Sequence, residues 1–317
     1  MSGVDLTDAR VAVIGASGFI GQHVVAALLE AGAEVAGFDR ALAVCPPHAR
    51  YTHLQGDAGN PTDVAPALAG ADAAICLAPS SLPVTANADF AAEVAGHLAP
   101  TIRLAELALA AGCRRFVYAS SGGTVYGAPG PGPLAETAAT LPQSAYGVTK
   151  LAMEHYLRVL GELRGLSALS LRVSNPYGPG QIAAQGQGLV AMAMKRAFEG
   201  APMVIWGDGS VVRDFVYIGD VARAYAVAAA PSGPVGAINV GSGSGLRLID
   251  IAKAVEAAAE RPLDLRFTEG RAIDVAANVL DISRAEKLLG WRPTTMLEDG
   301  LRQTAAWWRA RTIATRH

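Results

Sequence analysis

The chain has 317 residues, of which 51% are hydrophobic and 17% are charged. This length and this hydrophobic fraction are sufficient to fill the core of one large α/β domain, or of a domain with a smaller appendage. The formal net charge is −2, which gives no electrostatic reason to expect nucleic acid or an anionic membrane as a partner. The polar N-terminus and the lack of a long apolar run predict neither a signal peptide nor a membrane span.

The cysteines and histidines form no recognisable metal or disulfide pattern. The three cysteines, Cys45, Cys76 and Cys113, are widely spaced and form no Cys-x-x-Cys motif. We interpret them as reduced, mostly buried thiols of a cytoplasmic protein. The six histidines form no His-Glu-x-x-His motif, and we expect no metal site.

A glycine-rich turn follows the first predicted strand, residues 10–14. Its sequence is Gly15-Ala-Ser-Gly18-Phe-Ile-Gly21, and after it come a predicted helix over 22–31 and a second strand over 34–38 that ends in Asp39. Such glycines allow a tight turn and a close approach of the backbone to a pyrophosphate, which the N–H groups at the helix start can bind. The pattern predicts a dinucleotide-binding unit; the alternative is a glycine turn that only packs a helix on a sheet.

The acid after the second strand bears on the choice of dinucleotide. Asp39 stands where a carboxylate can accept hydrogen bonds from the adenosine ribose, and it would repel a 2′-phosphate, which favours NAD over NADP. Arg40 follows directly and weakens that preference.

Strands and helices continue to alternate. Strands are predicted over residues 51–55, 71–77 and 114–119, with helices starting near Pro61 and spanning 88–111. Pro100 should kink or split the second of these helices, and His97 in the same stretch is interpreted as a packed or surface histidine. The alternation predicts an α/β fold with a Rossmann-type doubly wound parallel sheet, whose ligands bind beyond the carboxyl ends of the strands. The residues at that edge include the glycine turn, Asp39, Asp57, Ala78, Ser120 and Ser121.

Tyr146 and Lys150 lie four residues apart in a predicted helix and therefore share one of its faces. A free tyrosine has a pKa near 10, and a cation held alongside favours the phenolate. The pair can make a base suited to removing a proton from a sugar hydroxyl. The same spacing also occurs by chance on solvated helix faces.

The second half of the chain is expected to build a smaller C-terminal substrate-binding lobe. We place the NAD-binding Rossmann domain at residues 1–175, with later segments returning to it, and the nucleotide-sugar-binding lobe at 176–317. The predicted helices are 189–198, 218–229, 248–259, 283–289 and 297–311, and the predicted strands are 203–206, 237–240 and 263–267.

These motifs together resemble one family. The chain is similar to an extended short-chain dehydrogenase/reductase of the NAD-dependent epimerase/dehydratase family, and its motifs are similar to those of UDP-glucose 4-epimerases. The resemblance rests on the glycine turn, Ser120-Ser-Gly-Gly-Thr-Val-Tyr-Gly127, Tyr146-x-x-x-Lys150, and the segments 171–180, 206–215 and 270–274.

The resemblance implies a role for each matching residue. Tyr146 would be the acid/base, helped by Lys150, and Ser121 or Thr124 would supply a catalytic hydroxyl. The implied cofactor-binding residues are Gly15, Ser17, Gly18, Phe19, Ile20, Gly21, Asp39, Arg40, Asp57, Ala58, Leu77, Ala78, Pro79, Ala119, Ser120, Tyr146, Lys150 and Pro176. The implied substrate-binding residues are Ser121, Gly122, Thr124, Asn175, Arg213, Arg271 and Asp274, with the two arginines gripping a diphosphate. For Arg213 alone, a surface salt bridge with Asp214 is the alternative.

Two departures from the family pattern affect the chemistry. Gly122 stands where epimerases of the family carry a catalytic Ser or Thr, so Ser121, Thr124 or a water would have to take the place of that hydroxyl. Gly123 and Thr124 occupy the places of the Asp-Glu pair that 4,6-dehydratases need, which counts against dehydration.

We therefore expect an NAD-dependent nucleotide-sugar epimerase that acts at C4 of a UDP-hexose or UDP-hexuronic acid through a transient 4-keto intermediate. An NAD(P)H-dependent nucleotide-sugar 4-ketoreductase is the alternative, followed by a sugar dehydratase and a non-catalytic dinucleotide-sensing protein. The resemblance also implies NAD as cofactor, a UDP-sugar as substrate and a homodimer.

Overall fold

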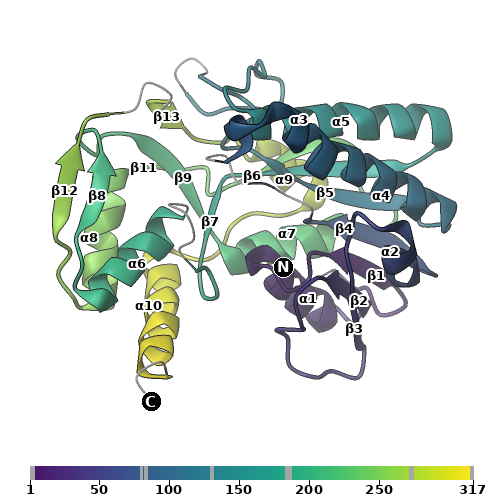
Figure 1. Cartoon of the computed structure of the whole chain (residues 1–317), viewed down its shortest axis with the longest axis horizontal. Coiled ribbons are helices and arrows are strands. Elements are labelled where there is room, and N and C mark those ends of the chain that lie inside the picture. Colours follow the sequence, from purple (N-terminus) through teal and green to yellow (C-terminus); the bar gives the residue numbers. More distant parts are fainter. Residues whose placement is uncertain are drawn as a thin grey trace.

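The central element is a seven-stranded sheet in the order β10-β6-β5-β4-β1-β2-β3. The computed structural model describes residues 4–78, 81, 85–128, 132–182, 188–270 and 275–314. Every neighbouring pair in this sheet is parallel, so the predicted doubly wound arrangement is confirmed (Figure 1). Its strands are β1 (Arg10–Ile14), β2 (Glu34–Asp39), β3 (Tyr51–Gln55), β4 (Ala73–Cys76), β5 (Arg115–Ser121), β6 (Ser167–Val173) and β10 (Gly236–Val240).

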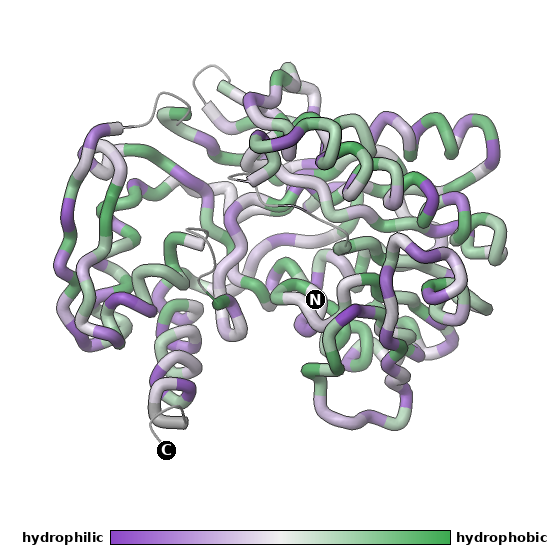
Figure 2. The backbone as a smooth tube through the Cα atoms, in the orientation of Figure 1, coloured by the Kyte–Doolittle hydropathy of each residue, from purple (hydrophilic) through white to green (hydrophobic). Residues whose placement is uncertain are grey.

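Helices cover both faces of the sheet and bury two separate hydrophobic clusters. Helices α1 (Phe19–Glu30), α7 (Ile218–Ala228) and α9 (Ser283–Leu289) pack on one face. Helices α2 (Pro61–Leu68), α4 (Ala99–Ala110) and α5 (Ala145–Arg164) pack on the other. Because helices cover both faces of the sheet, the residues of the central strands are apolar along the whole strand, and apolar residues do not alternate with polar ones there. Apolar and polar residues alternate along the surface helix α5 instead (Figure 2).

The predicted long helix over 88–111 contains a π-helical turn just before Pro100. A short 3-10 turn, η1 (Ala86–Ala88), is followed by α3 (Phe90–Glu93), the π-helical turn η2 (Val94–Leu98) and then α4. Pro100 lies in the first turn of α4, where its missing N–H group breaks no helical hydrogen bond. The backbone stays helical from residue 90 to 110, so the helix is not split at Pro100, and the wider π-helical turn is the distortion that precedes the proline.

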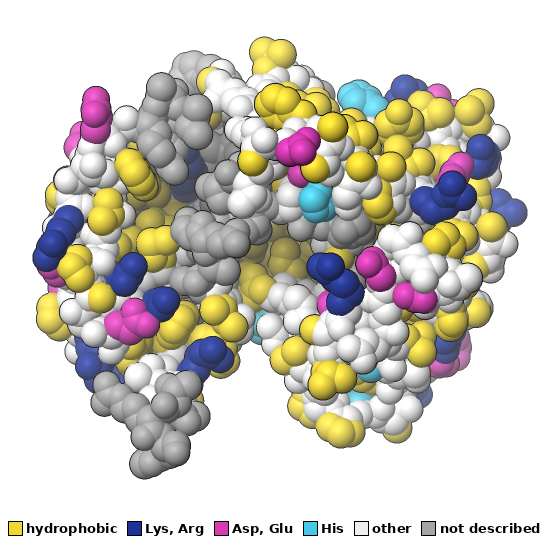
Figure 3. All heavy atoms as spheres, viewed as in Figure 1, with side chains coloured by type: hydrophobic (Ala, Val, Ile, Leu, Met, Phe, Trp, Pro, Cys, Tyr) yellow, Lys and Arg dark blue, Asp and Glu magenta, His cyan; other side chains and the backbone are white. Residues whose placement is uncertain are grey.

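A smaller lobe stands beside the sheet (Figure 1). Its core forms where α6 (Leu189–Glu199), α8 (Leu248–Ala259) and α10 (Leu297–Ala314) pack against the two-stranded parallel sheet of β8 (Met203–Trp206) and β12 (Leu265–Thr268). A third sheet centres on β9 (Val212–Tyr217), which pairs with β7 (Asn175–Tyr177), β11 (Gly245–Arg247) and β13 (Ala277–Asn278). The space-filling view is hollowed between the two lobes (Figure 3).

Segments from the second half of the chain return to the large sheet. Strand β10 pairs with β6, and α7 and α9 pack on the same face as α1. The division at residue 175 itself remains a prediction. None of the helices in the described ranges is both long and apolar enough to cross a membrane.

Candidate active site

The glycine turn after β1 is shaped for a close approach. Gly15 has φ +93°, a backbone conformation that favours glycine, and a Cβ atom there would lie 3.0 Å from the Cβ of Ala78. A Cβ at Gly21 would run into the carbonyl oxygen of Gly15, so this glycine lets α1 pack directly on the turn. Gly18 is the N-cap residue of α1.

The N-terminus of α1 suits a phosphate group. The helix begins at Phe19, three residues earlier than predicted, so Phe19, Ile20 and Gly21 form its first turn. Within the described structure this end has no side-chain cap and no acidic residue in the first turn. Its N–H groups and the positive end of the helix dipole can therefore serve an anion. The turn fits the pyrophosphate of a dinucleotide on these grounds.

Asp39 at the end of β2 is tied to the glycine turn. Its Oδ2 accepts a hydrogen bond from the backbone N–H of Ser17 at 3.0 Å, and its Oδ1 accepts one from Ala41 at 3.0 Å. Each carboxylate oxygen keeps acceptor capacity for a further donor such as a ribose hydroxyl. The aspartate therefore both fixes the turn and faces the place where the predicted ribose would lie.

A cavity of about 370 Å³ opens beside Asp39. It brings together seven of the predicted cofactor residues: Gly15, Asp39, Arg40, Asp57, Ala58, Leu77 and Ala78. The Asp57 carboxylate also accepts a hydrogen bond from Gly59 N–H at 2.9 Å, which shapes the loop at the rim. The predicted Pro79 lies outside the described residues. The sequence interpretation did not assign the remaining lining residues, which are Ile14, Phe38, Gly56, Gly59, Gly96, His97 and Pro100.

His97 reaches the cavity rather than only packing in a helix. Its Nδ1 lies 3.1 Å from the carboxylate of Glu93, one helical turn earlier, and Glu93 is 3% exposed against 28% for His97. Glu93 also accepts a hydrogen bond from the Ser81 hydroxyl at 2.9 Å. The four-residue spacing of Glu93 and His97 was a signal for their pairing that sequence reasoning passed over.

Tyr146 and Lys150 lie at the start of α5, and the structure brings them together as predicted. Ser144 caps the helix, and its hydroxyl accepts a hydrogen bond from Gly147 N–H at 3.2 Å. Lys150 is buried, its Nζ lies 5.3 Å from the Tyr146 ring centroid, and it donates a 2.8 Å hydrogen bond to the Ala119 carbonyl. The half-buried Tyr146 therefore stands beside a fixed cation at the end of β5.

Buried neutral groups surround the Tyr146–Lys150 pair. Burial raises the pKa of the Cys76 thiol to about 12, although the nearby charge of Lys150 acts to lower it. Burial likewise raises the pKa of Tyr118, whose ring lies 4.9 Å from Lys150 Nζ, and the pKa of Tyr225. All three groups therefore stay protonated at neutral pH, which leaves Tyr146 as the phenol that is both half-exposed and next to Lys150.

The hydroxyls after β5 have different environments. Ser120 is buried and its hydroxyl donates to the carboxylate of Glu154 on α5, so it is already engaged. The half-buried Ser121 hydroxyl makes no hydrogen bond to any described residue, and the Oγ1 of Thr124 is buried without a partner there.

Gly122 faces the protein interior. Its N–H donates to the Val173 carbonyl, and its carbonyl accepts from the Asn278 side chain. A Cβ there would lie 2.6 Å from Leu280 Cδ1 and 2.9 Å from the Arg172 carbonyl oxygen. A side chain at this position would therefore meet the core, and the glycine is required by packing.

The predicted substrate residues of the second half meet around β7 and β9. Asn175 donates from its side-chain amide to the Asp214 carbonyl at 2.8 Å, and Pro176 accepts from the Gln181 side chain at 3.0 Å. Arg213 on β9 donates to the carbonyls of Val212 and Val275. The predicted Arg271 and Asp274 lie outside the described residues.

Asp214 does not form a surface salt bridge with Arg213, so that alternative is wrong. Asp214 is fully buried and accepts hydrogen bonds from Ser174, from Ser242 and from the backbone N–H of Leu280. Burial raises the pKa of its carboxyl, while the N–H and hydroxyl donors act to lower it. Its role is to join β9 to the segments after β10 and β13.

The described residues contain no group of three or more His, Cys, Asp or Glu side chains that could hold a metal ion. What they do assemble is a glycine turn at an uncapped helix N-terminus, an aspartate bonded to that turn, an adjacent cavity and a Tyr-Lys pair along one edge of a parallel sheet. This combination defines a Rossmann-type, dinucleotide-dependent enzyme.

Comparison with known proteins gives the same class. The sequence pattern of the NAD dependent epimerase/dehydratase family matches residues 11–241. The UDP-glucose 4-epimerase of Mycolicibacterium smegmatis is 32% identical over 321 residues, covering 95% of this chain and 98% of that protein. The dTDP-4-dehydro-6-deoxyglucose reductase of Escherichia coli is 37% identical over 191 residues, 60% of each chain. The crystal structure of a Thermus thermophilus UDP-glucose 4-epimerase in complex with NAD matches with a TM-score of 0.86 at 32% identity, covering 95% of this chain and 99% of that one.

The chain belongs to the NAD dependent epimerase/dehydratase family. The predicted family, the predicted Rossmann-type fold and the prediction of an NAD-dependent enzyme are thereby confirmed.

Proposed function

We propose that this enzyme interconverts the C4 epimers of a UDP-hexose or UDP-hexuronic acid. The observation that carries the proposal is the placement of Tyr146 beside the buried, hydrogen-bonded Lys150, at the sheet edge that also holds the dinucleotide cavity. The similarity to UDP-glucose 4-epimerases along nearly the whole of both chains supports a sugar nucleotide as the substrate class.

The residues of the chain act mainly on the proton of the 4-hydroxyl. Tyr146 as phenolate accepts this proton while C4 loses a hydride, which leaves a 4-keto sugar. Lys150 stabilises the phenolate by its charge. Tyr146 then returns the proton to the oxygen when the hydride comes back to the other face of C4. NAD, when bound, would supply the hydride acceptor as NAD⁺ and the hydride donor as NADH, so the net reaction would consume no reductant.

Ser121 is our choice for the hydroxyl that orients the sugar. Its Oγ is uncommitted among the described residues, whereas Ser120 is bonded to Glu154 and Thr124 Oγ1 is buried. Arg213 on β9, with Arg271 and Asp274 assigned from the family motif alone, would bind the diphosphate and the nucleotide ribose.

A 4-ketoreductase is the second candidate, because the chain is also similar to a dTDP-4-dehydro-6-deoxyglucose reductase. That similarity covers 60% of each chain, less than the match to the epimerases. A dehydratase is disfavoured because Gly123 and Thr124 cannot supply the acid and base of that reaction.

The deciding experiment follows purified enzyme with UDP-glucose, and in parallel with UDP-glucuronic acid, by ¹H NMR of the anomeric protons. We expect the C4 epimer to accumulate without added NADH, and the Tyr146→Phe variant to lose this activity. Steady loss of absorbance at 340 nm with a 4-keto sugar nucleotide, and no epimer formation, would establish the reductase instead.

We propose further that two copies pair through helix α5. Its outward face carries Val148, Tyr156, Val159 and Leu163, and Phe90 on α3 is also exposed. The four apolar side chains of α5 lie on the side of the helix opposite to Lys150, and such a stripe on a helix surface favours association. The free, mostly buried cysteines suit the reducing cytoplasm, where we expect the enzyme to act.

A further inference from the structure

A buried ion pair lies directly behind the catalytic helix. Glu154 on α5 and Arg172 on β6 are 8% and 7% exposed, and their closest contact, from Nη2 to Oε2, is 2.7 Å. The Arg172 Nε also donates to both carboxylate oxygens, at 3.0 and 3.2 Å. Burial acts to lower the pKa of Arg172, but the hydrogen bonds and charge of Glu154 raise it above its usual range. The guanidinium therefore has its carboxylate partner within hydrogen-bond distance on one side.

Glu154 belongs to the same helix face as the catalytic pair. Tyr146, Lys150 and Glu154 follow one another at intervals of four residues along α5. Lys150 bonds to the Ala119 carbonyl and Glu154 bonds to the Ser120 hydroxyl. Two successive turns of α5 are thus fastened to two successive residues of β5, just before Ser121.

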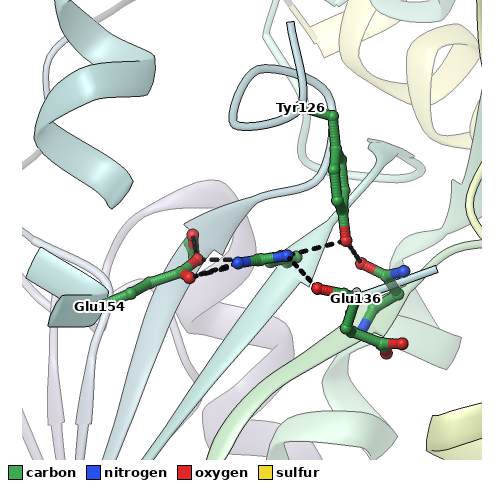
Figure 4. Close-up of polar contacts among 6 residues, drawn as sticks. Tyr126, Glu136 and Glu154 are labelled. Carbon is green, nitrogen blue, oxygen red and sulfur yellow. Dashed lines mark hydrogen bonds and ion pairs between the residues drawn. The ribbon is translucent and has the colours of Figure 1, made fainter. Parts of the chain in front are cut away.

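The far side of the guanidinium is held by the segment that follows β5 and by β10. Arg172 Nη1 donates to the Tyr126 hydroxyl at 3.0 Å and contacts the Glu136 carbonyl oxygen at 3.5 Å. Tyr126 in turn donates to Asn239 on β10 at 2.6 Å. Figure 4 shows Glu154 on one side of the guanidinium and Tyr126 and Glu136 on the other. The arginine therefore has a fixed geometry on both sides.

We propose that Glu154 and Arg172 are positioning residues that hold Tyr146 and Lys150 at the end of β5 and keep the electrostatic field at Tyr146 balanced. The inference rests on the proposed role of Tyr146 as the acid/base. A buried pair of this kind adds little to stability compared with apolar residues, so its value to the protein lies in what it fixes. Removing one partner leaves a single uncompensated charge behind the catalytic helix.

The sign of that charge predicts the direction of the effect. Glu154 lies eight residues from Tyr146, a rise of about 12 Å along the helix. At an effective dielectric constant of about 20, a unit charge at that distance shifts a phenol titration by roughly one pH unit. Burial is the largest cause that raises the pKa of Tyr118, and the charge of Glu154 also acts to raise it, so the charge of Glu154 reaches a group beside Lys150.

The other charged and titratable groups on the elements packed against this region stay the same in every variant. They include Cys76 on β4, Glu93 and His97 on α3 and η2, Tyr118 on β5, Tyr126, Glu136, Lys150, Tyr225 on α7, and the Glu106–Arg164 pair at the far end of α4 and α5.

The test measures two quantities against pH. The first is the tyrosinate absorbance at 295 nm, from which the absorbance of the Tyr146→Phe variant is subtracted to isolate Tyr146. The second is kcat. In Glu154→Gln the unpaired Arg172 favours the phenolate, so both midpoints should move down by roughly one pH unit. In Arg172→Gln the unpaired Glu154 disfavours the phenolate of Tyr146, so both midpoints should move up by a similar amount. The Glu154→Gln/Arg172→Gln double variant should return close to the wild-type midpoint.

Two further variants separate charge from geometry and from folding. Arg172→Lys keeps the charge and loses the two-pronged geometry, so its midpoint should stay in place while kcat falls about tenfold or more. Glu162→Gln removes the same charge from the same helix at an exposed ion pair with Arg158, where both side chains are more than half exposed. Its midpoint and kcat should match the wild type.

Opposite shifts in the two single variants support the inference. If the variants lose activity but their titration midpoints do not move, or if both midpoints shift in the same direction, the pair has only a structural role and the inference is wrong. If Arg172→Gln does not fold, the inference is still tested by two results: the downward shift of the midpoint in Glu154→Gln, and the return of the midpoint to the wild-type value in the double variant. Failure of the proposed function is distinguishable, because the absorbance titration of Tyr146 does not depend on which reaction the enzyme catalyses.

Discussion

The ammonium group of Lys150 donates a 2.8 Å hydrogen bond to the backbone carbonyl of Ala119. This bond joins the first turns of α5 to the carboxyl end of β5. The neighbouring strand is β4, and Leu77 and Ala78, which follow it, line the cavity beside Asp39. A buried cation is costly unless it has polar partners, and a carbonyl supplies one without neutralising the charge. The full positive charge therefore remains available to Tyr146.

Replacing Lys150 with methionine should lower kcat by about 10²-fold or more, because the phenolate of Tyr146 loses its neighbouring cation. The affinity for NAD, measured by fluorescence titration, should fall as well if the side chain also holds the nicotinamide ribose. Lys195→Met is the matched control, since Lys195 is exposed on α6 and its contact to Glu199 is 3.8 Å. Equal activity of Lys150→Met and wild type would contradict the assignment.

Restoring the family's serine at Gly122 should harm the protein rather than improve it. The new Cβ would lie 2.6 Å from Leu280 Cδ1 and 2.9 Å from a backbone oxygen, and such overpacking costs about 1–3 kcal/mol. Gly123→Ser is the control, because Gly123 is exposed and the nearest atom to its new Cβ is Ser121 Oγ at 4.0 Å. Urea unfolding should show a lower midpoint for Gly122→Ser only, whereas a higher kcat in that variant would show that the position does face the substrate.

Local signals predicted much of the fold and part of the site. The glycine turn, Asp39 and the Tyr-Lys spacing each depend on residues close together in the chain, and the structure places all of them at one edge of the sheet. A distortion of the helix near Pro100 was likewise predictable, because it follows from the missing N–H of one residue.

The features that the sequence interpretation missed depend on distant partners. Strand β9 was not predicted, since it is formed by pairing with β7, β11 and β13, each of three residues or fewer. The inward orientation of Gly122 depends on Leu280, far along the chain, and the burial of Asp214 depends on Ser242. The position of His97 at the cavity depends on the π-turn that precedes α4. Residue patterns within a short window contain no information on these contacts.

Placing a charge on the apolar face of α5 should separate the proposed dimer. Leu163 is 77% exposed, and Leu163→Arg would put an unpaired cation into the buried interface. Light scattering coupled to gel filtration should then give the 32.5 kDa mass of one chain in place of twice that mass. Met296→Arg introduces the same charge at a residue that is 66% exposed outside this face and should leave the dimer intact. A wild-type protein that is monomeric at micromolar concentration would refute the interface.

His23 should make the protein less stable in mild acid. It lies on α1, and its Nε2 donates a 2.8 Å hydrogen bond to the Pro179 carbonyl, just after β7. Burial lowers the pKa of His23, although this hydrogen bond acts to raise it. The unfolded chain therefore takes up the proton at a higher pH than the folded one, so the free energy of unfolding should fall as the pH drops through the ordinary histidine value of about 6.5.

Urea midpoints at pH 7.5 and pH 5.5 measure this contribution. His23→Gln keeps a side-chain N–H donor but cannot titrate, so its midpoint should fall less between the two pH values than that of the wild type. His155→Gln removes an exposed histidine from α5 and should leave the wild-type dependence unchanged. If His23→Gln and the wild type lose stability equally, the acid sensitivity comes from other groups, and the contact between α1 and the segment after β7 does not depend on a neutral imidazole.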